Sequence, residues 1–289
     1  EKGETLGLVG ESGCGKSTLR RCLIRLLDST AGKVLLRDRE GGGYTDVTKV
    51  NASTMKELRR RVQIVFQDPY SCLNPRLSVW ELIAEPLIVN NVYGSKTEMR
   101  KRIRELMSTV GLAERLENSY PHELDGGRRQ RIGIARSLAL NPEFIVLDEP
   151  VSALDVSIQA QILNLMQDLQ RDLGLTYMFI THDLSVVKHL SDEIAVMYLG
   201  QVVELASADE VFANPLHPYT RALLSAIPTP DPDFVTERII LRGEISSPID
   251  PKPGCRFAGR CVDAVPACSE ADVPLREVAP GHLCACTLC

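Results

Sequence analysis

The chain carries Gly10-Glu11-Ser12-Gly13-Cys14-Gly15-Lys16-Ser17 close to its start, and this run of glycines around a lysine constrains its architecture strongly. The run fits the pattern G-x-x-x-x-G-K-S/T, follows the apolar residues 6–9, and precedes a helical pattern that starts at Thr18. Such a loop uses glycines to turn backbone N–H groups toward a phosphate, a lysine to reach the phosphate oxygens and a hydroxyl to hold Mg²⁺. The pattern predicts a phosphate-binding loop, and the alternative is a glycine-rich turn without a ligand.

The residue types in this loop indicate how it would hold a nucleotide. Lys16 is expected at the β- and γ-phosphate oxygens and Ser17 at Mg²⁺. The complete set expected to contact the nucleotide is Gly10, Ser12, Gly13, Cys14, Gly15, Lys16, Ser17 and Thr18. ATP and Mg²⁺ are therefore the expected ligands of this part of the chain.

Length and composition limit the possible class of protein and the number of domains. The 289 residues, 44% of them hydrophobic and 25% charged, suffice for one full core and a smaller appended unit. No apolar run approaches the roughly 20 residues that cross a bilayer, and Glu1-Lys2-Gly3-Glu4 is unlike a signal peptide. We expect a soluble globular protein that serves a membrane through a partner. The net charge of −5 argues against a nucleic-acid-binding surface, and the arginines at residues 59–61 and 128–131 are explained as solvated helix faces.

Apolar periodicity predicts alternating strands and helices. Buried strands are expected at residues 6–9, 62–66, 144–147 and 176–180, and helices at residues 16–27 and 156–173. Three consecutive glycines within residues 38–44 predict a hairpin turn. Residues 79–139 follow a helical pattern with a stop at Gly111, which indicates a helical insertion. Alternation of this kind predicts an α/β fold with a parallel sheet covered by helices.

Two acids stand at the end of one expected buried strand. Asp148 and Glu149 follow residues 144–147, and the carboxyl ends of strands are where an open α/β sheet binds its ligand. Asp148 is expected to hold Mg²⁺ through its water shell, and Glu149 to orient or deprotonate the attacking water. The alternative is that the two acids belong to an ordinary turn or helix cap.

Two further polar residues also follow expected strands. Gln67 comes directly after residues 62–66, where its amide can contact both Mg²⁺ and the attacking water. His182 follows residues 176–181 and can donate a hydrogen bond to the γ-phosphate. A surface glutamine and a structural histidine are the ordinary alternatives. With Glu149, these two residues form the expected catalytic set.

The order of these motifs resembles that of the ABC transporter ATPases. Stretches similar to Walker A, the Q-loop, the signature, Walker B, the D-loop and the switch histidine occur in order at residues 10–17, Gln67, residues 124–131, residues 147–150, residues 152–155 and His182. The resemblance covers nearly the whole chain. It implies a P-loop NTPase (RecA-like) core with a parallel sheet over residues 1–228, including a helical subdomain at about residues 69–140.

The last part of the chain resembles a narrower group, the oligopeptide/dipeptide importer ATP-binding subunits. The similar stretches are His217-Pro218-Tyr219-Thr220-Arg221-Ala222-Leu223-Leu224, Gly254-Cys255-Arg256-Phe257, Arg260-Cys261 and Gly281-His282. The prolines within residues 228–232 predict a stiff, extended linker. Residues 229–289 are therefore expected to form a linker and a small Cys-rich C-terminal extension.

The resemblance also implies partners. Two nucleotide domains pair head to tail, so that signature and D-loop residues of one contact the nucleotide bound by the other; in this chain these are Asp125, Gly126, Gly127, Arg128 and Asp155. ATP binding closes the pair and hydrolysis releases it. Two membrane-spanning permease subunits, docked on the helical insertion, follow the motion, and an extracytoplasmic substrate-binding protein acts indirectly.

Two departures from the family pattern lead to further expectations. The family usually has Ser-Gly-Gly-Gln where this chain has Asp125-Gly126-Gly127-Arg128. An ionised aspartate would repel a phosphate oxygen by roughly 4 kcal/mol at about 4 Å and an effective dielectric near 20, unless Arg128 offsets it. We therefore expect an asymmetric heterodimer with one weaker site. Nine residues precede Gly10, whereas the family has upstream strands with an aromatic residue that stacks on adenine, so an incomplete gene product or a shortened chain is expected.

The cysteines concentrate near the end, where six of the nine lie within residues 255–289. An ATP-using chain without a secretion signal belongs in a reducing compartment, where clustered thiols indicate metal more often than disulfides. The resemblance implies a 4Fe–4S cluster on Cys255, Cys261, Cys268 and Cys286, and four thiolates suit such a cluster. Reduced thiols without a ligand and adventitious zinc are the alternatives.

The predicted function is ATP hydrolysis that powers the import of oligopeptides or dipeptides. The chain would act as a peripheral subunit on the cytoplasmic face of the cell membrane. One alternative is a soluble ABC ATPase acting on nucleic acid or ribosomes, and another is a catalytically weak regulatory subunit, which Asp125 would favour. Nickel or another small solute is the alternative substrate.

Overall fold

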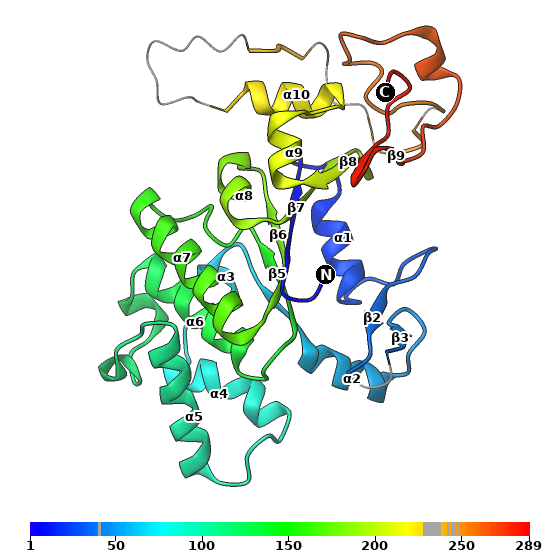
Figure 1. Cartoon of the computed structure of the whole chain (residues 1–289). Coiled ribbons are helices and arrows are strands. Elements are labelled where there is room, and N and C mark those ends of the chain that lie inside the picture. The colour runs from blue at the N-terminus through cyan, green and yellow to red at the C-terminus, as the bar shows by residue number, and fades with distance from the viewer. Residues whose placement is uncertain (40–41, 228–237, 242, 244–246, 248, 252) are drawn as a thin grey trace. The chain divides into compact units, whose positions relative to one another are not determined.

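The computed structural model describes residues 1–289 except 40–41, 228–237, 242, 244–246, 248 and 252 (Figure 1). Its strands are β1 (Thr5–Val9), β2 (Leu35–Arg37), β3 (Tyr44–Asp46), β4 (Val62–Val65), β5 (Phe144–Asp148), β6 (Thr176–Thr181), β7 (Glu193–Tyr198), β8 (Gln201–Ser207), β9 (Arg276–Ala279) and β10 (His282–Cys284). Its α-helices are α1 (Lys16–Leu23), α2 (Ala52–Arg61), α3 (Pro69–Cys72), α4 (Val79–Val89), α5 (Lys96–Thr109), α6 (Gly126–Leu138), α7 (Val156–Leu173), α8 (Leu184–Leu190), α9 (Ala208–Ala213) and α10 (Pro218–Ser225). Short 3-10 helices are η1 (Glu114–Leu116), η2 (Pro121–Glu123) and η3 (Pro266–Ser269).

The chain forms two compact units that interleave in sequence. The first unit comprises Glu1–Glu4 and Thr18–Met178, and the second comprises Thr5–Ser17 and Phe179–Cys289. The glycine-rich loop and the strand before it thus belong to the second unit, whereas most of the helix after the loop belongs to the first.

The first unit is built around helix α6. Strands β4 and β5 pair in parallel, with Val62 opposite Phe144 and Val65 opposite Leu147, and β6 begins beside β5. Helix α6 packs against β4 and against α3, α4, α5 and α7, and its Ile132 is fully buried. The elements from α4 to α6 are helical, as the sequence pattern predicted for residues 79–139 (cyan to green in Figure 1).

Local sequence signals set the ends of these helices. At the start of α4, Ser78 and Glu81 form a reciprocal capping box, which satisfies N–H groups that a helix start otherwise leaves open. After α5, Gly111 has a φ of +69°, a left-handed conformation that glycine adopts without strain, and it ends the helix where the sequence predicted a stop.

The second unit places β1 inside a mixed sheet, with strands on both sides of it. The end of β6 lies on one side of β1, and β7, β8, β10 and β9 follow on the other. β1 and β7 are parallel, with Leu6 opposite Glu193, whereas β8, β10 and β9 continue antiparallel. Gly7 lets helix α8 approach β1, because a Cβ atom there would collide with Val187. Together with the parallel β4–β5 pair, this gives the predicted α/β fold with a predominantly parallel sheet.

Helix α1 is shorter than its predicted span of residues 16–27. It ends at Leu23, and Arg25 takes a left-handed backbone with a φ of +50°. The guanidinium of Arg25 donates to the carbonyl oxygens of Val47 (3.2 Å) and Val50 (2.7 Å), which holds the chain in this turn. Contacts with a distant segment thus end a helix that periodicity alone would continue.

The other predicted elements differ little from those observed. Strands β2 and β3 pair antiparallel and confirm the expected hairpin, although residues 40–41 of its connection lie outside the described residues. The predicted proline-rich linker also lies largely outside them. Along the described part of the chain, none of the helices combines the length and the apolar character that crossing a bilayer requires.

Candidate functional site

The glycine-rich loop of the second unit has the open backbone that its sequence predicts. Gly13 and Gly15 have φ angles of +82° and +106°, which favour glycine. A Cβ atom at Gly13 would meet nothing within 4 Å, so this part of the loop is open to a ligand. The N–H of Gly200 donates to the carbonyl of Cys14 at 2.7 Å, and this hydrogen bond stabilises the loop.

Lys16 lies inside this loop with 7% of its surface exposed. Its Nζ donates to the carbonyl oxygens of Gly10 (2.6 Å) and Glu11 (3.0 Å) and lies 3.7 Å from the Sγ of Cys14. Carbonyls and a thiol are neutral groups, so a buried ammonium is held among acceptors that do not cancel its charge. Such a group favours an anionic ligand. The next residue, Ser17, is exposed.

The acidic residues lie in the first unit, at the end of β5. Asp148 is 4% exposed and forms an ion pair with Arg20 of helix α1. Glu149 has a φ of +44°, an unusual backbone for a residue with a Cβ atom. The Nε2 of Gln67 donates to the Oε2 of Glu149 at 2.8 Å. The structure therefore brings together the glutamine and the glutamate that the sequence placed in one catalytic set.

Sequence reasoning did not find Arg20. The sequence signal that could have indicated Arg20 is its spacing, because it lies one helical turn after Lys16. The ion pair shows that the charge of Asp148 already has a cationic partner inside the protein.

The signature residues form the start of helix α6. Asp125 is its N-cap, and its Oδ1 accepts the N–H of Arg128 at 2.8 Å. The Nη1 of Arg128 lies 3.4 Å from the Oδ2 of Asp125. Between them, Gly126 and Gly127 leave little room on the side of α7, because a Cβ atom at Gly127 would lie 2.6 Å from Ile158. The charge of Asp125 is thus partly offset by Arg128 and by the helix N-terminus.

The remaining predicted residues occupy element boundaries. Thr18 is exposed in the first turn of α1, and Asp155 is the N-cap residue of α7. His182 directly follows β6, as predicted, and is exposed in the second unit.

The cysteines of the C-terminal region are close in part but do not form a metal site. The N–H of Cys255 donates to the carbonyl of Cys268 at 2.7 Å, and the Sγ of Cys284 lies 3.9 Å from that of Cys289. Burial raises the pKa of Cys255 and Cys261, and raises that of Cys286 to about 11. Among the described residues, no three His, Cys, Asp or Glu side chains are placed to share a metal ion. This arrangement does not fit a 4Fe–4S cluster.

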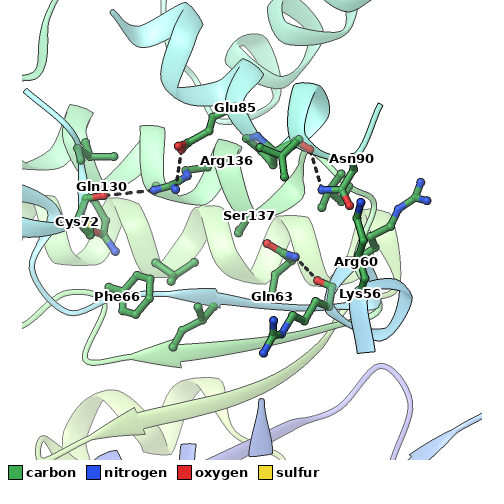
Figure 2. A pocket seen from close by; sticks show the side chains of 18 of the residues that line it. Lys56, Arg60, Gln63, Phe66, Cys72, Glu85, Asn90, Gln130, Arg136 and Ser137 are labelled. Carbon is green, nitrogen blue, oxygen red and sulfur yellow. Dashed lines mark hydrogen bonds and ion pairs between the residues drawn. The ribbon is translucent and has the colours of Figure 1, made fainter. Parts of the chain in front are cut away.

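A pocket of about 490 Å³ opens between α2, β4, α4 and α6 of the first unit (Figure 2). Inside it, Arg136 pairs with Glu85 (Nη2 to Oε2, 2.8 Å) and donates to the carbonyl of Cys72 at 3.2 Å. Lys56 and Arg60 of α2 contribute positive charge to its lining. Phe66, which directly precedes Gln67, also lines it, so the pocket adjoins the segment that reaches Glu149.

Comparison with known proteins agrees with this fold and these motifs. Residues 1–152 match the family described as ABC transporter, and residues 203–268 match the family described as oligopeptide/dipeptide transporter, C-terminal region. The chain therefore belongs to the ABC transporter family.

Particular relatives narrow this class. The chain is 51% identical, over 287 residues, to the oligopeptide transport ATP-binding protein OppF of Salmonella typhimurium, covering 99% of this chain and 84% of that protein. It is 50% identical, over 291 residues, to the oligopeptide transport ATP-binding protein AppF of Bacillus subtilis, covering 100% of this chain and 86% of that protein.

Solved structures support the fold independently. The structure of cbiO1 from Clostridium perfringens, part of the ABC transporter complex cbiONQ, superposes with a TM-score of 0.64 at 29% identity, covering 74% of this chain and 81% of that chain. An ATP-binding cassette in a dimeric post-hydrolysis state with ADP and Pi has a TM-score of 0.61 at 31% identity, covering 72% of this chain and 87% of that chain. The predicted P-loop NTPase fold is confirmed.

Proposed function

We propose that this chain is the ATP-binding and ATP-hydrolysing subunit of an ABC importer for oligopeptides or dipeptides. The observation that carries the proposal is the identity of about half of all positions, over nearly the full chain, to oligopeptide transport ATP-binding proteins. The buried ammonium of Lys16 inside an open glycine loop supports the nucleotide-binding part. The relatives' names favour an importer over the nucleic-acid and regulatory alternatives.

The triphosphate would be held by Gly10 and by residues 12–18. Backbone N–H groups of the loop face the phosphates, and Lys16 exchanges its carbonyl partners for phosphate oxygens. The residues proposed to hold Mg²⁺ are Ser17, Asp148 and Gln67. Mg²⁺, when bound, neutralises phosphate charge that develops during transfer.

Glu149 is the proposed general base, and the remaining residues orient the reaction. The hydrogen bond from Gln67 fixes the position of one carboxylate oxygen of Glu149. Arg20, through its ion pair with Asp148, holds that carboxylate in place before the nucleotide arrives. His182 is proposed to donate a hydrogen bond to the γ-phosphate.

The test is Glu149→Gln in the complete transport complex. A base-assisted hydrolysis predicts a loss of ATP turnover of at least about a hundredfold with retained ATP binding, because general-base catalysis contributes about 10² to 10⁴. Glu114→Gln, an exposed acid of η1, is the matched control and should turn over ATP normally. Unchanged turnover in Glu149→Gln would remove Glu149 from the mechanism.

The chain would work in a head-to-tail pair with a second ABC ATPase subunit. In that pair, Asp125, Gly126, Gly127, Arg128 and Asp155 would face the partner's nucleotide. Arg128 offsets part of the charge of Asp125, so the repulsion at this site is smaller than the sequence alone implied. The remaining repulsion between Asp125 and the partner's nucleotide would make that site the weaker one of an asymmetric heterodimer.

Asp125→Ser tests this asymmetry. Serine is as good an N-cap as aspartate, so helix α6 keeps its start while the charge is removed. ATP turnover of the assembled complex should rise. Asp209→Ser, in the first turn of α9 and outside the proposed nucleotide site, measures what loss of charge at a helix start does by itself. Unchanged turnover with Asp125→Ser would refute the weaker site.

The pocket of the first unit is the proposed docking site for a permease subunit at the cytoplasmic face of the membrane. It offers exposed apolar surface at Phe66 and Val89 beside the positive charge of Lys56 and Arg60. A short helix with an apolar side chain and an acidic residue complements both features. Because Phe66 precedes Gln67, movement of the occupant would reach the residue bonded to Glu149.

Val89→Asp tests the docking site, since it places a charge in the apolar lining. Recovery of the permease subunits with this chain from detergent-solubilised membranes should fall. Leu173→Asp, at the end of α7 outside the pocket, is the control at an exposed apolar residue and should recover them normally. Equal recovery with both variants would place docking elsewhere.

The predicted 4Fe–4S cluster, which the described arrangement of cysteines does not fit, has no role in this mechanism. Protein purified without oxygen should contain about four iron and four sulfide per chain if Cys255, Cys261, Cys268 and Cys286 hold a cluster. Zinc in place of iron, or neither metal, would support one of the two alternatives.

A further inference from the structure

Glu11, the second residue of the glycine-rich loop, is held by two side chains from far along the chain. Its N–H donates to the hydroxyl of Tyr219 at 2.9 Å. Its carboxylate receives both terminal nitrogens of Arg260, at 2.8 and 3.3 Å, across a separation of 249 residues. All three residues belong to the second unit. The C-terminal region therefore contacts the loop through a two-pronged ion pair, and helix α10 contacts it through a backbone hydrogen bond.

The chain segment that carries Arg260 is held by local hydrogen bonds and by aromatic packing. The segment from Cys255 to Cys261 folds into tight turns, in which Cys261 donates its N–H to the carbonyl of Phe257 at 3.0 Å. Phe257 is 1% exposed and packs edge-on against Tyr198 at 5.2 Å between ring centroids. Tyr219 also contacts Phe257, at 5.3 Å. Tyr219 belongs to an aromatic cluster with Tyr198, His217 and Phe257, and the Nη1 of Arg260 donates to the hydroxyl of Tyr198 at 3.5 Å.

The charge of Glu11 makes this contact important for an anion. A carboxylate in a loop whose N–H groups face phosphates would repel a triphosphate. Arg260 is 11% exposed and Glu11 27% exposed, so solvent screens their pairing only in part. The arginine cancels the adverse charge and fixes the side chain that carries it.

We propose that Arg260 is a positioning residue for nucleotide binding, which neutralises Glu11 and holds the first turn of the phosphate loop open for the triphosphate. The C-terminal region then sets the affinity of the loop for ATP. This inference rests on the proposed nucleotide site. A reading in which Glu11 serves merely to anchor the C-terminal region makes different predictions for paired variants.

The experiment is a double-mutant cycle on the full chain, with the dissociation constant of a fluorescent ATP analogue as the readout. Arg260→Gln should weaken binding roughly tenfold, the loss expected for one charged hydrogen-bond pair. In the Glu11→Gln background, the same change should weaken binding less than about twofold, because no adverse charge is left to neutralise. The tenfold effect should shrink as salt rises, since salt screens partly exposed charges.

Different variants test the proposed nucleotide site and the proposed role of Arg260. If Lys16→Ala leaves binding unchanged, the proposed nucleotide site itself is wrong. If Lys16→Ala abolishes binding while Arg260→Gln has no effect, the inference alone fails. If Arg260→Gln weakens binding of the ATP analogue equally with and without Glu11→Gln, Arg260 serves only to anchor the C-terminal region. That result would also overturn the inference.

Thermal unfolding of each variant checks that it folds. Should Arg260→Gln unfold, Arg260→Lys carries the test, because it keeps the charge but loses the two-pronged geometry. It should weaken binding about threefold, and Glu11→Gln should remove that effect. An unchanged dissociation constant in Arg260→Lys under those conditions would overturn the inference.

Discussion

Acid should destabilise this protein through His217, which is buried at the start of helix α10. Its ring Nδ1 accepts the backbone N–H of Tyr219 at 3.1 Å, and the backbone N–H of His217 donates to the Oε2 of Glu204 at 3.0 Å. Burial lowers the pKa of His217 from 6.5 to about 4, while the charge of Glu204 opposes this shift and that of Arg221 adds to it. In the folded protein the ring therefore stays neutral at pH values where an unfolded chain would bind a proton.

The sign and size of the effect follow from this difference. A lowered histidine pKa gives stability that is present above pH 6.5 and is lost as the pH falls toward about 4. Each unit of pKa difference is worth about 1.4 kcal/mol, so the whole interval corresponds to about 3 kcal/mol. The residue is 1% exposed, so solvent screening reduces this figure little.

Urea unfolding of the full chain at pH 7.5 and pH 4.5 measures the loss. His217→Asn is the informative variant, because asparagine can cap the helix but does not titrate. Between the two pH values, the free energy of unfolding of wild type should fall by about 2 to 3 kcal/mol more than that of this variant. His122→Asn, at an exposed position, should behave as wild type. Equal losses in wild type and His217→Asn would refute the reasoning, as would an NMR titration of the His217 ring near pH 6.5.

Three further outcomes are expected. Gly127→Ala should cost about 1 to 3 kcal/mol in urea unfolding, because its Cβ would lie 2.6 Å from an isoleucine of α7, whereas Gly133→Ala, with nothing within 4 Å, should not destabilise. Phe257→Ala should lower the free energy of unfolding by about 3 to 5 kcal/mol, since it empties a fully buried site; a thermal midpoint equal to that of wild type would contradict this. Gln67→Glu should lower ATP turnover at pH 8 and move the pH optimum toward acid, because it sets two carboxylates where a 2.8 Å hydrogen bond joined Gln67 to Glu149; an unmoved pH profile would argue against that contact in the working enzyme.

Much of the architecture follows from patterns within short stretches of sequence. Helix α7 spans the predicted residues 156–173, because its apolar residues recur at helical spacing and Gly174 ends it with a φ of +64°. Helix α6 begins at Gly126 with Asp125 as its cap, as expected for an aspartate before a helix. The glycine-rich loop was identifiable from its own spacing, since its backbone conformation depends on the residues in it.

Contacts between distant segments could not be obtained in this way. The end of α1 depends on carbonyls near residue 50, the partner of Asp148 is an arginine 128 positions earlier in the numbering, and Glu11 meets Arg260 across 249 residues. Periodicity and capping act over a few residues, so they determine elements and their ends. Which charged side chain neutralises which, and which aromatic ring supports the phosphate loop, depends on how the chain packs, because Coulomb and packing forces act on distance in space and not on distance in sequence.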